Sequence, residues 1–477
     1  MRNCLLLSLS LLIAASSQAG NLQYVASGST LVTGPISHPV LGQGSQHNPA
    51  ALVNNTHRAR ISLIDVNLGI AVQGLGEFNT AFEELSDQLN EIDRVFTAFG
   101  DDNATVGEVL SEVNAMEAAF DTNVERLADN LYIKPHLLIS APFTPLDINL
   151  GDHGTLSVSA SSLTQARGGL LHGPIEFEIN AQTVNDANDD NIDLDPIDYL
   201  RTTSSVYLKQ AQVWNASLGY ARPLPEMALL ERNGFDATFG ARATLIGYRL
   251  QKNLYPLKSL ARAATEDDSE LFDQIAADIQ DGFSDYQFTA AVDLGFSLTR
   301  GNSQYGLTLY NLNSPSLRYN SLGGDCAALA TESEQTNCFH AEYFASVGDI
   351  ALKEEHVMSP HLTLDANRSW LNQRLILAGS ADLWRKTDLF GETRQDLKVS
   401  FIAQPTAWYW PGMRLGAGKD LQDIDATALG AGLTFFRFFH LDAAMNAVWG
   451  DLNSSDATRA GNALRSAQVA ASFDIRF

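Results

Sequence analysis

Residues 284–300 read SDYQFTAAVDLGFSLTR, and their side chains alternate between apolar and polar. The apolar positions are Tyr286, Phe288, Ala290, Val292, Leu294, Phe296 and Leu298, and the others include Asp293, Gly295 and Ser297. A period of two predicts a β-strand whose two faces meet different surroundings. A soluble sheet with one face in water would show the same pattern. In a membrane barrel, the polar face would line the lumen, and aromatics near the strand ends would lie at the membrane interfaces.

Similar alternation recurs along the chain. Residues 300–302 (Arg-Gly-Asn) form a tight-turn sequence, and residues 303–312 (SQYGLTLYNL) return as the second strand of a predicted hairpin. About fourteen candidate strands result: 61–73, 154–163, 174–181, 205–221, 235–250, 284–300, 303–312, 358–369, 373–385, 395–405, 411–418, 428–437, 439–449 and 465–477. Residues 133–142 could add one more strand, which would change the parity of the count.

The connections between these strands fall into two classes by length. If the last strand ends in the periplasm, the external connections are 182–204, 251–283, 313–357, 386–394 and 450–464. The connections 301–302, 370–372 and 406–410 are then periplasmic, and they are short. Bacterial outer-membrane barrels have short periplasmic turns and long external loops, whereas a soluble β-sandwich has no reason to separate them. The sequence therefore predicts an all-β fold, an outer-membrane antiparallel β-barrel of about 14 strands.

The N-terminus carries the features of an export signal. Arg2 precedes an apolar run at residues 5–14, and residues 17–19 (Ser-Gln-Ala) give the small-x-small pattern that signal peptidase accepts before Gly20. The apolar run is much shorter than the roughly 20 residues that a spanning helix needs. We therefore expect residues 1–19 to be a signal peptide that directs export to the outer membrane of a Gram-negative bacterium.

Composition excludes several classes of protein. The net charge of −25 argues against nucleic acid as a partner, because phosphates require Lys and Arg for neutralisation. The mean hydropathy of −0.09 excludes a helical membrane bundle. A length of 477 residues would ordinarily suggest about three domains, but all-β barrels exceed that guideline as single units.

Residues 77–130 depart from the β pattern. The first stripe with helical spacing consists of Phe78, Phe82, Leu85, Leu89, Ile92, Phe96 and Phe99, and the second of Val106, Val109, Val113, Met116, Phe120 and Leu127. Residues 105–108 (Thr-Val-Gly-Glu) match a capping box at the start of the second helix. We expect an antiparallel helical hairpin inserted in the barrel. Its 14 acidic residues could form a solvated outer face or a surface for a partner.

We find no sequence signature of an enzyme. The G-x-S-x-G, H-E-x-x-H, Walker A and C-x-x-C motifs are all absent. The sequence therefore predicts no catalytic residue, no metal site and no cofactor.

Cys326 and Cys338 are the cysteines left after removal of the signal peptide. Both lie in the longest predicted external connection, 313–357, and exported proteins meet an oxidising compartment. His340 is the only nearby candidate ligand, so a zinc site is disfavoured. We therefore predict a disulfide between the two cysteines.

The segment before the first strand contains the residues that suggest a family. Residues 42–52 read GQGSQHNPAAL, in which Asn48, Pro49 and Ala50 follow a Gly-rich stretch suited to a tight turn. The chain here resembles the FadL-like outer-membrane channels, whose N-terminal segment carries Asn-Pro-Ala and plugs the barrel. The mature chain is also similar to the exported proteins labelled conjugal transfer TraF-like, a branch of that superfamily, with residues 306–312 as a weaker match. A different, thioredoxin-like TraF is disfavoured because C-x-x-C is missing.

The resemblance implies a domain arrangement and a function. We expect an N-terminal plug at residues 20–55 and a barrel at residues 56–477, with the helical hairpin 77–130 inserted. The implied function is passive passage of a hydrophobic small molecule through a channel embedded in outer-membrane lipid. The alternatives are a surface anchor or assembly component that displays the acidic hairpin, and a soluble periplasmic β-rich binding protein.

The chain ends in AQVAASFDIRF, residues 467–477, another strictly alternating strand. The resemblance includes an aromatic C-terminus that the barrel assembly machinery reads, which makes Phe477 a candidate barrel-insertion signal. The alternative is that Phe477 only anchors the last strand at the membrane interface.

Overall fold

The computed structural model describes residues 25–38 except 27, 44–54, 58–74, 76, 80, 84, 105–179, 199–225, 232–265 and 285–477 except 406 and 408. The predicted signal peptide, residues 1–19, lies outside the described residues. Of the first predicted hairpin helix, residues 77–99, only Thr80 and Glu84 are described.

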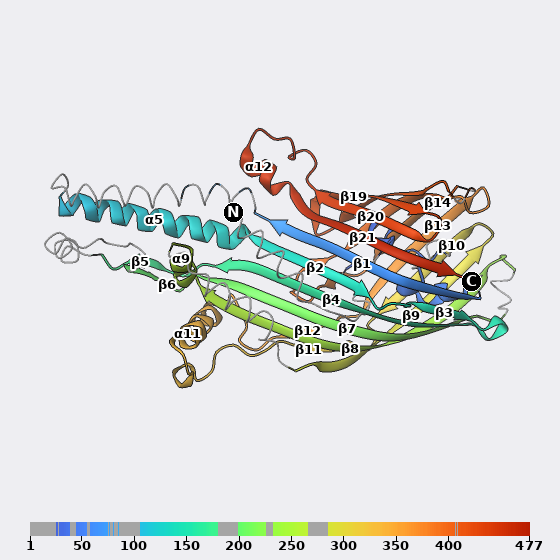
Figure 1. Cartoon of the computed structure of the whole chain (residues 1–477), viewed down its shortest axis with the longest axis horizontal. Helices are drawn as coiled ribbons and strands as arrows, with labels where there is room; N and C mark the ends of the chain where they lie inside the picture. Colours follow the sequence, from blue (N-terminus) through green and yellow to red (C-terminus); the bar gives the residue numbers. More distant parts are fainter. Residues whose placement is uncertain are drawn as a thin grey trace.

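The strands form one closed antiparallel sheet (Figure 1). Its members are β1 (Ala59–Gln73), β2 (Tyr132–Ser140), β3 (Leu146–Asn149), β4 (Thr155–Leu171), β7 (Ser205–Pro223), β8 (Asp236–Pro256), β9 (Gln287–Arg300), β10 (Ser303–Tyr310), β13 (His361–Trp370), β14 (Leu375–Asp382), β17 (Asp396–Ala403), β18 (Gly412–Asp420), β19 (Asp423–Phe435), β20 (Phe439–Ala447) and β21 (Leu464–Arg476). Each strand pairs with its sequence neighbours, and β1 pairs with β21 to close the barrel. Strands β2 and β3 are successive halves of one interrupted strand, because both lie between β1 and β4. The barrel therefore has fourteen strands, as predicted.

The predicted strand at 174–181 is not part of the barrel. Only β5 (Ile175–Phe177) forms there, and it pairs with β6 (Leu200–Thr202) outside the barrel sheet. Residues 133–142, left open by the sequence, supply β2 instead. The predicted count is correct because these two errors cancel.

The alternation in the sequence predicts which side chains of the barrel wall face the lumen and which face outward. On β9, Asp293 and Ser297 are almost fully buried, whereas 60% of Phe288 is exposed on the outer surface. The polar residues on the inner faces of other strands include Asp65, Asn67, Asn215, Ser217, Arg242, Thr308, Thr363, Asp365, Asp442 and Asp474. Outward residues include Ile64, Leu68, Leu218, Leu245, Leu364, Leu377, Val399, Leu415, Leu441 and Val469. A polar interior inside an apolar band is the arrangement of outer-membrane barrels.

The two ends of the barrel differ in the length of their connections. The short end carries the connections 150–154, 224–235, 301–302, 371–374, 404–411 and 436–438. The C-terminus lies at this end, on the right in Figure 1. The opposite end carries the longer connections, with 421–422 as a short exception. The segregation of loop length predicted from the sequence is therefore confirmed.

Helix α5 (Val106–Asn130) extends from the long-connection end, well beyond the barrel (Figure 1). It begins with the predicted capping box, in which Thr105 Oγ1 accepts a hydrogen bond from Glu108 N and Glu108 Oε2 accepts one from Thr105 N. Among the described helices, none is long and apolar enough to cross a bilayer.

The apolar stripe of α5 explains why the strand predicted at 174–181 leaves the barrel. Val113, Met116 and Val124 pack against Ile175 and Phe177 of the β5–β6 hairpin. The alternating apolar residues of this segment therefore face a helix, not lipid.

Candidate functional site in the barrel lumen

The N-terminal residues cross the inside of the barrel. We call residues 25–38 and 44–54 the lumenal segment. Helix α2 (Thr30–Thr33) contacts β17, β18, β19 and β20, whereas the 3₁₀ helix η2 (Pro49–Asn54) contacts β4, β7, β8, β9 and β10. Between these helices lies α3 (Gly44–His47). Because these two groups of strands form opposite walls, the segment bridges the lumen.

Asn48 organises one end of the lumenal segment. Its side-chain Nδ2 donates hydrogen bonds to Ser37 Oγ at 2.9 Å and to the carbonyl oxygen of Phe296 on β9 at 3.2 Å. Its Oδ1 accepts a hydrogen bond from Ala50 N at 3.0 Å, which caps the start of η2. Pro49 occupies the first helical position, where the missing N–H is not needed. The Asn-Pro-Ala sequence is thus a structural corner docked on the barrel wall.

Two glycines on the inner wall make room for this corner. A Cβ on Gly240 of β8 would lie 2.4 Å from the carbonyl carbon of Pro49 and 2.5 Å from Ala50 N. A Cβ on Gly295 of β9 would lie 2.2 Å from Asn48 Oδ1. Real Cβ atoms do not approach other atoms so closely, so any larger residue would displace the corner.

Charged wall residues hold the same end in place. Arg242 of β8 donates to Asp293 Oδ2 of β9 through Nε at 2.9 Å and Nη2 at 2.7 Å, and its Nη1 donates to the carbonyl oxygen of Gln46. Ser37 donates through both its N and its Oγ to the carboxylate of Asp365 on β13, each at 2.8 Å. The lumenal segment therefore supplies hydrogen-bond partners for the charged groups of Arg242 and Asp365, which point into the lumen.

The other end of the segment docks on the opposite wall. A Cβ on Gly416 of β18 would lie 1.9 Å from the carbonyl oxygen of Val32. Ser400 Oγ of β17 donates to the carbonyl oxygen of Thr33 at 3.2 Å. The backbone of the lumenal segment therefore lies close to the backbone of the barrel strands at both ends of the segment.

Cavities lie on both sides of the lumenal segment. Towards the long-connection end, a cavity of about 120 Å³ lies beside α2 and is lined by the charged residues Asp382, Lys386, Arg394, Asp396, Lys398 and Asp420. Lys386 Nζ lies 2.7 Å from Asp382 Oδ2 and 2.8 Å from Asp396 Oδ2. The neighbouring carboxylates hold the pKa of Lys386 above its usual value against the effect of burial. A second cavity, of about 730 Å³, lies at the short end and shares no lining residue with the first.

The opposite side of the lumen is apolar near the long-connection end. Two connections, 311–360 and 383–395, place side chains against the inner faces of β2, β4, β7 and β8. We call the resulting group the apolar cluster, and its members include Leu138, Leu163, Val213, Ile246, Leu250, Leu317, Met358, Leu389 and Phe390. The lumen therefore has a charged wall and an apolar wall.

Ion pairs fasten the 383–395 connection inside the barrel. Lys134 Nζ of β2 donates to Asp388 Oδ2 at 2.7 Å and also contacts Glu392. Tyr319 Oη, from the 311–360 connection, donates to the carbonyl oxygen of Leu389 at 2.7 Å. The two connections thereby close the half of the lumen at the long-connection end together.

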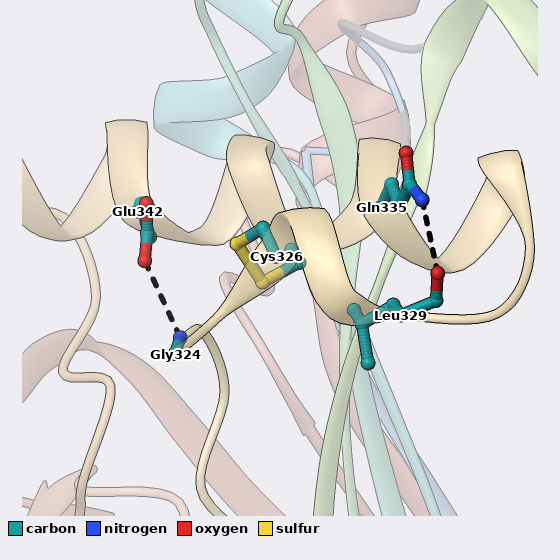
Figure 2. Close-up of a disulfide and its surroundings, with 6 residues drawn as sticks. Gly324, Cys326, Leu329, Gln335 and Glu342 are labelled. Carbon is teal, nitrogen blue, oxygen red and sulfur yellow. Dashed lines mark hydrogen bonds between the residues drawn. A yellow bond between two sulfur atoms is a disulfide. The ribbon is translucent and has the colours of Figure 1, made fainter.

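The 311–360 connection contains the predicted disulfide, which is confirmed (Figure 2). Cys326, in η4 (Cys326–Ala328), is bonded to Cys338, in α11 (Glu332–Val347), with a Cα–Cα distance of 5.5 Å. Glu342 Oε1 of α11 accepts a hydrogen bond from Gly324 N at 3.3 Å. The two sulfurs and Glu342 lie close together, but bonded sulfurs are not the thiolates that a metal ion binds.

Helix α11 packs on the end of β8. Phe344 and Ala341 are buried against Leu254, and His340 Nδ1 lies 2.9 Å from Ser205 Oγ. Burial lowers the pKa of His340, so its imidazole stays neutral at neutral pH. The disulfide thus tethers η4 to a helix that is already docked on the barrel.

The variant Cys326→Ser/Cys338→Ser is expected to loosen η4 and α11 without unfolding the barrel. Loss of a disulfide that closes a loop of this size should lower the free energy of local unfolding of η4 and α11 by roughly 3 kcal/mol. Hydrogen exchange should speed up in residues 326–347 and stay unchanged in β9, which is the internal control. Two thiols that react without reductant in the denatured wild-type protein would contradict the bridge.

Comparison with known proteins places the chain in a family. Residues 46–382 match the family described as "F plasmid transfer operon, TraF, protein". The match covers well over half of the chain. The chain belongs to this TraF family. No curated protein matches the chain.

Several solved barrels are similar to this TraF family member. The Pseudomonas putida toluene transporter TodX is 13% identical, with 96% of this chain and 99% of that chain covered and a TM-score of 0.40. The Ralstonia pickettii toluene transporter TbuX is 11% identical, with coverage of 96% and 99% and a TM-score of 0.42. A Pseudomonas aeruginosa FadL homologue is 12% identical, with coverage of 94% and 98% and a TM-score of 0.35.

The structure places the predicted residues of this TraF family member at three separate locations. Asn48, Pro49 and Ala50 lie together in the lumen, whereas the disulfide lies in the 311–360 connection at the long-connection end. Phe477 lies at the short end of the barrel, with 65% of its surface exposed, and its N donates to the carbonyl oxygen of Ala59 at 2.9 Å.

Sequence reasoning missed the wall residues that receive the lumenal segment. Arg242 and Asp365 of the wall, like their neighbour Ser37 in the lumenal segment, carry no motif that marks them in the sequence. Gly240 and Gly295 offered a weak signal, because glycine disfavours a strand interior unless another backbone approaches closely.

Proposed function

We propose that the protein is an outer-membrane channel whose N-terminal residues 20–55 plug a barrel formed by residues 56–477. The observation that carries this proposal is the lumenal segment, which bridges opposite walls inside a closed barrel. It is held by side-chain contacts such as Ser37 to Asp365 and by close fit against Gly240. Such contacts can break without disturbing the strand pairing of the wall.

The proposed permeant is a hydrophobic small molecule that enters at the apolar cluster. An apolar wall is unusual inside an outer-membrane barrel, where lumen-facing residues are mostly polar. Leu389 and Phe390 cover this wall and sit on a connection fastened by Lys134. Displacement of that connection would expose an apolar site towards the outside. Movement of the lumenal segment would then let the molecule pass to the periplasm.

Uptake by liposomes tests this function. The full mature chain, reconstituted into liposomes, is expected to admit a hydrophobic fluorophore such as N-phenylnaphthylamine into an enclosed acceptor phase faster than empty liposomes. The variant Phe390→Asp should slow uptake because it places a charge in the apolar cluster. The matched control Leu383→Asp changes a half-exposed residue of the same connection and should not. A rate equal to that of empty liposomes would contradict the channel.

A second candidate function is a surface anchor or assembly component. It is favoured by α5, which extends beyond the barrel and exposes Glu108, Glu112, Glu125 and Asp129. In this case deletion of residues 77–130 should abolish capture of a partner by whole cells and leave liposome uptake intact. The soluble periplasmic alternative fits poorly with the apolar outer band, and membrane fractionation would test it.

Phe477 is proposed to be a recognition element for the barrel assembly machinery. The variant Phe477→Ala keeps the backbone hydrogen bonds to β1, so any loss reports on the ring. We expect export to continue and the folded protein in the outer membrane to fall several-fold, as measured by heat-modifiable gel mobility. Phe436→Ala, at the same end, is the matched control. Equal losses in both variants would indicate general interfacial anchoring instead.

A further inference from the structure

The cavity at the short end of the barrel has features that the channel proposal does not use. We call it the vestibule, and its volume is about 730 Å³. It is lined by the turns 372–374 and 436–438, by residues 404–405 and 473–476, and by Thr434 and His440. The vestibule therefore opens at the end that faces the periplasm in our assignment.

The vestibule is cationic in a strongly anionic protein. Its lining contains three guanidinium groups, from Arg374, Arg437 and Arg476, against one carboxylate, from Asp474. Asp474 Oδ2 is already bound to Arg60 Nη2 at 3.0 Å. The whole chain carries a net charge of −25, so this excess of positive charge is local.

Arg374 contributes a guanidinium group, unpaired within the described structure, to the cationic lining of the vestibule. Among the described residues, none forms a hydrogen bond or ion pair with its guanidinium group. Arginine guanidinium groups bind phosphate and carboxylate through paired hydrogen bonds. Arg374 is exposed, so its guanidinium group is accessible to a ligand.

The turns that line the vestibule have an unusual backbone. Phe436 and Arg437 have φ values of 52° and 67°, the left-handed conformation in which a two-residue hairpin turn prefers Asn-Gly. Leu371, Asn372 and Gln373 also have positive φ, from 53° to 64°. Side chains held in an unfavourable backbone conformation mark candidate functional positions.

Aromatic rings also line the vestibule. The Phe436 and Phe438 rings stack with centroids 5.8 Å apart, and the Phe438 and Phe473 centroids are 4.7 Å apart. Phe436 is 47% exposed. The vestibule therefore offers both cationic donors and an apolar surface.

We propose that the vestibule binds a phosphate group, as carried by the headgroup of an anionic phospholipid or by free inorganic phosphate. Clustered guanidinium groups supply the charge and the donors for the phosphate oxygens. The aromatic stack would contact the glycerol and acyl part of a lipid and would be unused by inorganic phosphate. This site does not depend on the channel proposal, because it needs no movement of the lumenal segment.

Native mass spectrometry of the purified full mature chain tests this site. Short-chain phosphatidylglycerol, phosphatidylcholine and inorganic phosphate are the three probes. We expect phosphatidylglycerol to bind about tenfold more tightly than phosphatidylcholine, and Arg374→Gln to remove most of that preference. Because the guanidinium of Arg374 has no partner in the described structure, this variant should fold normally, as checked by heat-modifiable mobility. Arg374/Arg437/Arg476→Gln should lower the affinity further.

Arg300→Gln is the matched control. Arg300 lies at the same end, at the last position of β9, and does not line the vestibule; its guanidinium carbon is 5.3 Å from the Phe235 ring centroid. Phosphate binding lost in Arg374→Gln and kept in Arg300→Gln would support the site, and equal effects of inorganic phosphate and phosphatidylglycerol would assign it to free phosphate. Unchanged binding of all probes in the Arg374 variant and in the triple variant would overturn the proposal.

Discussion

Replacement of Gly240 by valine is expected to release the lumenal segment and open the barrel. The new Cβ would lie 2.4 Å from the carbonyl carbon of Pro49, and the backbone of that corner cannot shift without losing the hydrogen bonds of Asn48. Overpacking of this kind costs about 1–3 kcal/mol. Because 1.4 kcal/mol is a factor of ten, the undocked population should rise by about fivefold to a hundredfold. Single-channel conductance in planar bilayers and sensitivity of cells to large antibiotics should both increase.

The control for this experiment is Gly379→Val on β14. A Cβ on Gly379 would meet only Lys398 O, at 3.4 Å, and would not touch the lumenal segment. This variant should keep wild-type conductance and the wild-type mobility shift on heating. If Gly240→Val stays closed while it folds normally, the lumenal segment does not gate the barrel.

Replacement of Arg60 by methionine should strongly destabilise the barrel at the seam where its first and last strands meet. Arg60 of β1 lies 3.3 Å from Asp147 of β3 and 3.0 Å from Asp474 of β21, and all three side chains are almost fully buried. Removal of one partner from a buried ion pair leaves uncompensated charge and costs about 3–5 kcal/mol. The temperature at which the folded gel band disappears should therefore fall markedly.

Arg58→Met is the matched control, because Arg58 is exposed two residues earlier on the same chain segment. Addition of Asp147→Asn and Asp474→Asn to the Arg60 variant should recover part of the lost stability, because the two carboxylates that lost Arg60 then carry no charge. An Arg60→Met protein as heat-stable as Arg58→Met would show that the triad does not hold the seam.

The sequence determined the features whose causes are local. The strand at 284–300 is recognisable because every second side chain must meet lipid and every other one the lumen, so a few neighbouring residues carry the whole signal. The capping-box residues Thr105 and Glu108 are three positions apart, and the disulfide partners are twelve positions apart. Such contacts leave a pattern within a single element or loop.

Only the tertiary structure determined whether the apolar face of a strand packs against lipid or against another part of the protein. Residues 174–181 alternate as a barrel strand does, yet Ile175 and Phe177 pack against α5. In β2, Lys134 lies on the inner face of the barrel and Pro135 has no backbone N–H to donate to a neighbouring strand. These two residues made residues 133–142 a poor match to a typical strand sequence. Alternation in the sequence shows that the two faces of a strand have different surroundings, but it does not show what packs against either face.

The lumen itself could not be derived from the sequence. Ser37 and Asp365 are 328 positions apart, and Lys134 and Asp388 are 254 apart, so neither pair leaves a local pattern. Gly240 and Gly295 are required only because another part of the chain lies against them. The sequence by itself determined a barrel and a resemblance that implied a plug. How the plug docks was determined only by closure of the sheet into a barrel, because closure brings side chains from strands that are distant in the sequence to line the same lumen.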